Sequence, residues 1–140
     1  MKPGIDTIGV GVGALLVRDG KALMLLRTDR CRNNRGKWTI PGGMAEPEET
    51  LEDAVRREAL EEAGVRLTAV QFLALSDRFF DGQHWVSLLY LCKTDDEPAN
   101  QEPHMHSRLE WVDIGHLPEN VTAPSADAIA AYRILMADQV

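Results

Sequence analysis

The order of apolar and polar positions along the chain predicts short strands over most of its length. Runs rich in Val, Ile, Leu and aromatic residues are bounded by Gly, Pro, Asn and Asp, which is typical of strands separated by turns. These runs lie at 8–17, 21–27, 38–40, 66–76, 84–92 and 108–114. Asp-Gly pairs stand between the first two runs and between the fourth and fifth, at Asp19-Gly20 and Asp81-Gly82. Each pair predicts a tight hairpin turn between antiparallel strands.

Two segments have the apolar spacing of an amphipathic helix. The first is 50–64, where Leu51 and Val55 share a face and Gly64 is a typical residue to end the helix. The second opens at Pro124-Ser125, and its apolar positions are Ile129, Tyr132, Leu135 and Met136. The order of strands, helix, strands and helix predicts an α/β or α+β fold, with helices packed on a mixed sheet.

Length and composition predict one domain that covers residues 1–140. A chain of 140 residues with 44% hydrophobic and 26% charged residues is long and apolar enough to bury a core. The formal net charge is −7 and no run of Lys or Arg is present, which argues against a nucleic acid polymer or an anionic membrane as partner. A small polyanion is still compatible with this charge if metal ions neutralise it locally.

Cysteine usage and hydropathy favour a reducing cytoplasm. Cys31 and Cys92 are the only cysteines, so neither a disulfide framework nor a zinc motif is indicated. The apolar run 8–17 is too short to span a membrane, and no small-residue cleavage site follows it. We therefore expect a cytoplasmic protein.

The stretch RREALEEAG, residues 56–64, crowds three glutamates onto one helix of an already acidic chain. With about 100° of rotation per residue, Glu58 and Glu62 fall on the apolar side of this helix and Glu61 falls at its border. Burying an unpaired carboxylate is costly, and carboxylate oxygens suit a hard cation such as Mg²⁺ or Mn²⁺. Two interpretations stay open from the helix alone: a metal site, or a solvated helix end.

The wider spacing around these glutamates resembles the motif of the Nudix hydrolases. Residues 43–65 fit G-x5-E-x7-R-E-U-x-E-E-x-G-U, in which U is a bulky aliphatic residue. The fixed positions are filled by Gly43, Glu49, Arg57, Glu58, Glu61, Glu62 and Gly64. The one departure is Ala59, where a larger aliphatic residue is usual. Glu110-Trp111 followed by Leu117-Pro118 is similar to the MutT-like branch, so the resemblance covers nearly the whole chain and implies a Nudix α/β/α sandwich.

The resemblance implies a metal-dependent pyrophosphohydrolase that cleaves a nucleoside diphosphate linked to another group, with Mg²⁺ or Mn²⁺ as cofactor. The neighbourhood Phe80-Asp81-Gly82 lacks the proline of ADP-ribose enzymes, and no tyrosine typical of dinucleoside polyphosphate enzymes precedes Tyr90. A nucleoside or deoxynucleoside triphosphate is therefore the favoured substrate. An ADP-ribose or other nucleoside-diphosphate-sugar hydrolase is one alternative, and a non-catalytic nucleotide-binding module is another.

The resemblance also implies roles for individual residues. The implied metal ligands are the carbonyl of Gly42 and the carboxylates of Glu58, Glu61 and Glu62. The implied catalytic acids are Glu58, Glu61 and, from the polar loop 93–107, Glu102, for which Glu97 is the competitor. On that loop, His104 and His106 are interpreted as a solvated pair. Glu49 and Arg57, placed on one helix, predict a structural ion pair, although Arg57 is also placed to orient Glu58 or Glu61.

Three residues are candidates for substrate binding. Arg27 ends the strand 21–27, where its guanidinium could meet a phosphate or could be a surface charge. Gly11, like Gly9 and Gly13, has no side chain on one face of the first strand. Either a nucleotide base or a closely packed core helix could therefore approach this face. Trp38 offers a stacking surface, as do Phe79, Phe80 and Trp85, although large aromatic residues mostly belong to the core. A homodimer is the expected assembly.

Overall fold

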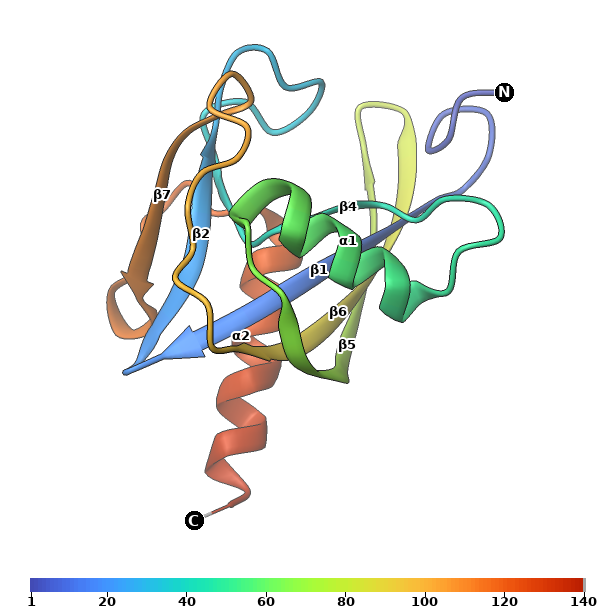
Figure 1. Ribbon diagram of the computed structural model, residues 1–140. Helices are drawn as coiled ribbons and strands as arrows, with labels where there is room; N and C mark the ends of the chain where they lie inside the picture. Colours follow the sequence, from blue (N-terminus) through green and yellow to red (C-terminus); the bar gives the residue numbers. More distant parts are fainter. Residues whose placement is uncertain (140) are drawn as a thin grey trace.

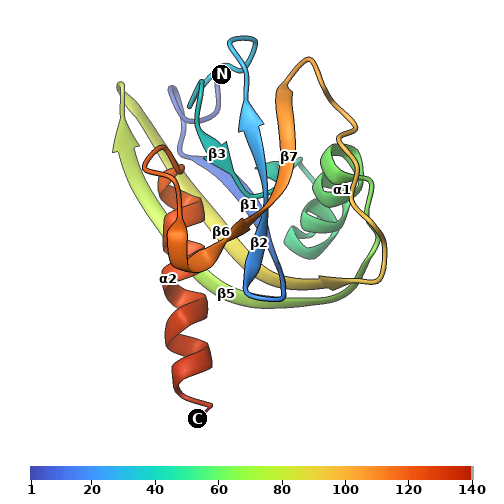
Figure 2. The ribbon, with the colours of Figure 1, turned by 90° about the vertical axis from the view of Figure 1, so that its left-hand side faces the viewer.

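The computed structural model describes residues 1–139, in which a mixed sheet lies between two α-helices (Figures 1 and 2). Along these residues the strands are β1 Gly9–Arg18, β2 Lys21–Arg27, β3 Trp38–Thr39, β4 Gly42–Met44, β5 Leu67–Phe80, β6 Gln83–Thr94 and β7 His106–Asp113. The α-helices are α1 Leu51–Ala63 and α2 Ala123–Ala137, and a 3₁₀ turn, Ile114–His116, follows β7. The α+β sandwich expected from the sequence is confirmed.

Strand β1 is the centre of the sheet. It pairs antiparallel with β2 on one side and parallel with β6 on the other, and the main strand order is β3-β2-β1-β6-β5. β7 joins the sheet beside β2, and β4 pairs antiparallel with β1. Because both faces of β1 are covered, its residues from Gly11 to Leu16 are all buried, which explains the continuous apolar run in the sequence.

The two helices cover opposite faces of the sheet, and each closes its own part of the core (Figure 2). Helix α1 packs with Ala54, Val55 and Ala63 against β1 residues such as Val12 and Leu16. Helix α2 packs through Ala128 and Ile129 in a second cluster that includes Leu15, Met24 and Leu89. Ala59, the one departure from the aliphatic motif, is completely buried in the α1 cluster, so a small residue fits there.

Both predicted Asp-Gly hairpins are present. Asp19 and Gly20 have φ angles of 52° and 76°, and Asp81 and Gly82 have φ angles of 48° and 71°. Two successive positive φ angles are typical of the turn that joins two antiparallel strands directly. The second hairpin carries β5 and β6 beyond the range expected from hydrophobicity, as far as the pair Phe80 and Gln83.

Strand β4 was not expected from the sequence. Its residues, Gly42, Gly43 and Met44, have little intrinsic preference for a strand. They are extended because they pair with Gly13, Val12 and Gly11 of β1, respectively. This pairing lays the backbone of β4 directly beside helix α1.

Two further expectations concern cysteines and membrane segments. Cys31 and Cys92 are both free and buried. No helix within residues 1–139 combines the length and apolar composition that crossing a membrane requires.

Candidate active site

Helix α1 begins and ends where local capping signals place it. The Thr50 side chain accepts a hydrogen bond from the Asp53 amide at 3.1 Å, and Gly64 ends the helix with φ 68°. These caps set where the helix begins and ends, and its buried face runs through Ala59 to Glu62. The prediction that Glu58 and Glu62 lie on the apolar side of this helix is confirmed, because their side chains are only 12% and 9% exposed.

Glu62 links α1 to β4. Its Oε1 atom accepts a hydrogen bond from the Gly42 amide at 2.7 Å, and the whole residue is 7% exposed. Burial disfavours the charged carboxylate and raises the pKa of Glu62 to about 8, despite the hydrogen bond from Gly42, which lowers it. Without a cation, burial therefore favours the protonated form of this carboxyl group.

Glu58 lies against Gly43, and this contact requires a glycine. A Cβ atom on Gly43 would lie 2.6 Å from the carboxyl carbon of Glu58, and one on Gly42 would lie 2.2 Å from the carbonyl oxygen of Val12. The two glycines therefore allow β4 to fit between β1 and the carboxylates. Burial raises the pKa of Glu58, and the like charges of Glu61 and Glu102 contribute to the rise.

Arg57 holds several acidic groups at once. Its Nε and Nη2 atoms donate to the two carboxylate oxygens of Glu49 at 2.7 and 3.0 Å, and Nη1 donates to Glu58 at 2.8 Å and to Glu61 at 3.3 Å. The predicted ion pair with Glu49 is thus observed, and Arg57 also contacts the two carboxylates that it was predicted to orient. Glu49 is not on the helix, however, because it precedes the capping residue Thr50.

Glu102 reaches the glutamate cluster because its loop is tied to the end of α1. The amides of Ala99 and Gln101 donate to the carbonyls of Ala63 and Glu62, which have no further helical turn to bond to. One carboxylate oxygen each from Glu62 and Glu102 and one ring nitrogen of His106 all lie within 4.8 Å of one another. The competitor Glu97 instead pairs with Arg18 at 2.9 Å and is 84% exposed.

The interpretation of His106 as a solvated loop residue is wrong. His106 is 1% exposed, its Nε2 atom lies 3.6 Å from Glu62 Oε2, and neither ring nitrogen has a hydrogen-bond partner within residues 1–139. Burial lowers the pKa of His106 to about 4. His106 is the first residue of β7 and pairs with Arg27, so long-range strand pairing buries it. His104 is exposed, as expected.

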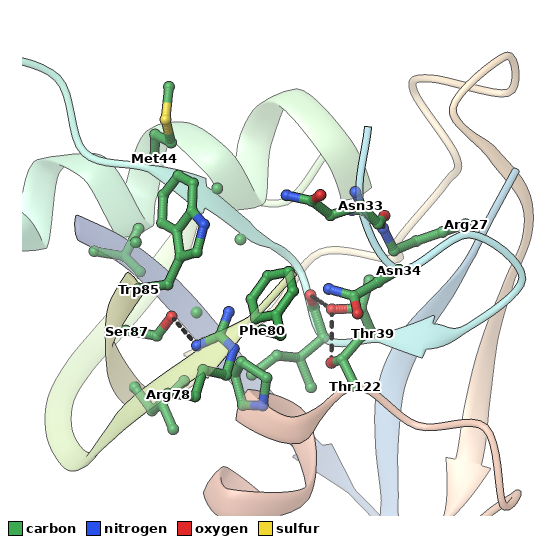
Figure 3. Close-up of a pocket in the computed structure, with 18 residues that line it drawn as sticks. Arg27, Asn33, Asn34, Thr39, Met44, Arg78, Phe80, Trp85, Ser87 and Thr122 are labelled. Carbon is green, nitrogen blue, oxygen red and sulfur yellow. Dashed lines mark hydrogen bonds between the residues drawn. The ribbon is translucent and has the colours of Figure 1, made fainter. Parts of the chain in front are cut away.

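A cavity adjoins the carboxylates across β4 (Figure 3). Gly42 and Gly43 form part of its wall, and the carboxyl groups of Glu62 and Glu58 lie next to these two glycines. The side chains that line the rest include Arg27, Asn33, Asn34, Thr39, Arg78, Phe80, Trp85 and Ser87. The arrangement places a space for a small molecule beside a buried acidic cluster that can hold a divalent cation or accept a proton.

The three predicted substrate-binding residues have different positions. Gly11 lines the cavity, and Arg27 lines it while its Nε atom donates to the Asn33 carbonyl at 2.9 Å. Trp38 does not line it, because it is packed in the α2 cluster and is 8% exposed. The aromatic residues of the cavity are Phe80 and Trp85 (Figure 3).

Arg78 and Ser87 were not predicted as site residues, although both line the cavity. Arg78 donates to the Ser87 hydroxyl at 3.1 Å, drawn as a dashed line in Figure 3. Burial lowers the pKa of Arg78, while the charge of Asp127 opposes this. The signal that could have found Arg78 is strand alternation, because Arg78 and Phe80 lie two residues apart on β5 and share one face.

The comparisons with known proteins agree on one family. Residues 7–132 match the family model described as the NUDIX domain. A nudix hydrolase of Caenorhabditis elegans is 30% identical over 119 residues, which is 82% of this chain but only 32% of that protein. The CTP pyrophosphohydrolase of Escherichia coli K12 is 31% identical over 100 residues, 71% of this chain and 72% of the other.

A solved structure has the same fold. The crystal structure of a MutT NUDIX hydrolase from Burkholderia pseudomallei superposes with a TM-score of 0.84 at 34% sequence identity. The match covers 90% of this chain and 98% of the Burkholderia chain.

Proposed function

Because this chain belongs to the Nudix family of hydrolases, we propose that it hydrolyses nucleoside or deoxynucleoside triphosphates to a monophosphate and pyrophosphate. The observation that carries the proposal is the position of the acidic cluster. The Glu58 carboxyl group lies next to Gly43, Glu62 accepts a hydrogen bond from the Gly42 amide, and both glycines also line the cavity. A nucleotide in the cavity would therefore have its phosphates close to the carboxylates.

The residues of the cluster fit a divalent cation. Glu58 and Glu62 are buried, Glu102 is close to Glu62, and Arg57 is bonded to Glu49 as well as to the cluster. A cation would stabilise the ionised form of these groups, whose pKa values are raised by burial. The proposed ligands are Glu58, Glu61, Glu62, Glu102 and the Gly42 carbonyl. When bound, Mg²⁺ or Mn²⁺ would screen the phosphate charges and polarise the phosphorus–oxygen bonds.

Glu58 is the proposed general base, which accepts a proton from the attacking water. A general base acts best when its pKa lies near the working pH, and burial moves the pKa of Glu58 upward from its ordinary value. The Arg57 Nη1 atom, 2.8 Å from Glu58 Oε1, holds the carboxylate in one orientation. Glu61, 51% exposed, and Glu102 are the remaining candidates for this role.

Binding in the cavity would separate recognition of the base from recognition of the phosphates. Phe80 and Trp85 present aromatic faces for a base, and Gly11 leaves room beside Ser87. Arg27 adds a guanidinium that matches phosphate oxygens. A triphosphate is further supported by the 31% identity to a relative named CTP pyrophosphohydrolase. The cytoplasmic location and the homodimer stay predictions.

The test is an assay of released products over a substrate panel with Mg²⁺ and with Mn²⁺. ATP, GTP, CTP, their deoxy forms and ADP-ribose are incubated with the wild-type protein, and products are separated by ion-exchange chromatography. We expect a monophosphate and pyrophosphate from at least one triphosphate, and none without metal. Cleavage of ADP-ribose but of no triphosphate would overturn the substrate proposal, and no cleavage of any substrate would overturn the proposed activity.

A further inference from the structure

We propose that His106 supplies an imidazole nitrogen to the cation held by Glu62 and Glu102. The site would then have mixed oxygen and nitrogen ligands and would favour Mn²⁺ over Mg²⁺. This inference rests on the cation site of the proposed function, and it adds a nitrogen ligand to the oxygen ligands of that site.

The first observation is the convergence of three ligand atoms. One carboxylate oxygen each of Glu62 and Glu102 and one ring nitrogen of His106 lie within 4.8 Å of one another. The three residues come from α1, from the loop before β7 and from β7 itself. Ligand atoms that each lie about 2.1 Å from one ion are about 3.0 to 3.5 Å apart in neighbouring positions. The 3.6 Å between His106 Nε2 and Glu62 Oε2 is near that range.

The second observation is that the imidazole ring of His106 is buried without a hydrogen-bond partner among residues 1–139. The side chain is 2% exposed, and neither Nδ1 nor Nε2 has a hydrogen-bond partner in the part of the chain that the structure describes. Buried polar groups are nearly always satisfied, because an unpaired one costs free energy. At 3.6 Å the ring is too far from Glu62 for a hydrogen bond, so an ion between them would give the Nε2 atom of His106 a partner.

The backbone holds His106 and Glu102 in this relation. The amides of Met105 and His106 both donate to the Glu102 carbonyl at 2.9 Å, which folds the segment into a single turn. The Asn100 side chain donates to the His106 carbonyl at 2.7 Å and closes the turn from the other side. The backbone positions of Glu102 and His106 are thus held without an ion.

A nitrogen ligand changes which ion is preferred. Mg²⁺ prefers oxygen ligands in near-ideal octahedral geometry and gives up its waters reluctantly. Imidazole is a better ligand for first-row transition-metal ions, which bind N/O sites with affinities that rise from Mn²⁺ onward. Replacing His106 should therefore reduce Mn²⁺ affinity far more than Mg²⁺ affinity.

The direct test is pulsed EPR of the Mn²⁺ complex. Wild-type protein with natural histidine and protein labelled with ¹⁵N-histidine are each loaded with Mn²⁺, and electron spin-echo envelope modulation is recorded. We expect a nitrogen coupling that changes with the label. If Mn²⁺ binds but no histidine coupling is seen, this inference is overturned and the proposed function stands. If neither Mn²⁺ nor Mg²⁺ binds, the proposed cation site fails as well.

Affinity measurements on two variants supply the second test. His106→Leu should weaken Mn²⁺ binding at least about tenfold while weakening Mg²⁺ binding much less. His104→Leu is the matched control, since His104 is an exposed histidine of the same loop, and it should leave both affinities unchanged. Equal loss of Mn²⁺ and Mg²⁺ affinity in folded His106→Leu protein would show that His106 has only a structural role.

Discussion

Glu62 shows at the level of one residue how the fold prepares an acidic group for a cation. Its position in α1 places Glu62 on the buried face of the helix, and the Gly42 amide donates a hydrogen bond of 2.7 Å to its Oε1 atom. A single amide does not compensate a buried charge, so the pKa rises to about 8. Glu58 is also shifted upward, although Arg57 opposes the shift. Without a cation, both carboxyl groups are therefore poorly stabilised as anions.

The first prediction concerns these two acids. Glu58→Gln and Glu62→Gln should each lower kcat by at least about a hundredfold, the usual effect of removing a general base or a charged ligand. Both variants should fold, because glutamine has the same shape and retains an oxygen acceptor. Steady-state kinetics and melting curves are the measurements. Glu97→Gln, which alters an exposed acid bonded to Arg18, is the control, and near-wild-type turnover in both site variants would refute the assignment.

The second prediction is the pH dependence of stability in metal-free protein. The folded pKa of Glu62, about 8, exceeds its ordinary 4.5, so its contribution is fully present below pH 4.5 and is lost as pH rises towards 8. The folded pKa of His106, about 4, lies below its ordinary 6.5, so its contribution is lost as pH falls from 6.5 towards 4. The two effects oppose each other below pH 6.5, and only that of Glu62 acts from 6.5 to 8.

Metal-free wild-type protein should therefore melt at lower temperature as pH rises from 6.5 to 8. Glu62→Gln should reduce this slope, because glutamine does not titrate. Calorimetry across that range is the measurement. A wild-type slope that persists unchanged in Glu62→Gln would mean that another group causes it.

At the level of elements, β4 connects the acidic cluster to the cavity. Its two glycines face different neighbours, since a Cβ on Gly43 meets the carboxyl group of Glu58, whereas a Cβ on Gly42 meets the Val12 backbone. The strand was not predicted because glycines have no strand preference, and its conformation comes from pairing with β1. Helix α1 was predicted well because helical spacing and caps are local signals.

The third prediction separates these two glycines. Gly43→Ala should displace the Glu58 carboxylate, so it should lower kcat by about tenfold or more while changing the melting temperature little. Gly42→Ala should instead lower the melting temperature by several degrees, because the backbone of β1 must move. Kinetics and thermal melts on the pair are the measurements. The opposite pattern would contradict the proposed role of Gly43 in admitting Glu58.

The fourth prediction concerns the loop between β6 and β7. Glu102→Gln should lower kcat by about tenfold or more, because Glu102 lies with Glu62 and His106. Glu97→Gln should leave kcat near the wild-type value, since Glu97 is bonded to Arg18 on the surface. Parallel kinetic assays with Mg²⁺ compare the two. Equal rates for Glu102→Gln and wild type would remove Glu102 from the site.

At the level of the whole molecule, topology places the cavity beside the carboxylates. The parallel pairing of β1 with β6 brings Trp85 and Ser87 beside Gly9 and Gly11, and the β5–β6 hairpin adds Phe80 to the same cavity. The sequence indicated the acidic cluster because most of its residues lie within one motif. It did not indicate Arg78, the burial of His106 or the position of Trp38 outside the cavity, because those positions depend on contacts between distant segments.

The fifth prediction and the most direct test of the account is the effect of divalent cations on thermal stability. An ion that binds only the folded protein stabilises it by RT ln(1 + [L]/Kd), or about 2.7 kcal/mol at a hundred times Kd. For a domain of 140 residues this should raise the melting temperature by several degrees.

The measurement is a set of calorimetric melts of wild type and Glu62→Gln at pH 8, without metal and with saturating Mg²⁺ or Mn²⁺. Wild-type protein should melt several degrees higher with either ion, and Glu62→Gln should show a much smaller shift, since it lacks a charged ligand. If neither ion moves the wild-type melting temperature, with or without nucleotide present, the buried glutamates do not form a cation site.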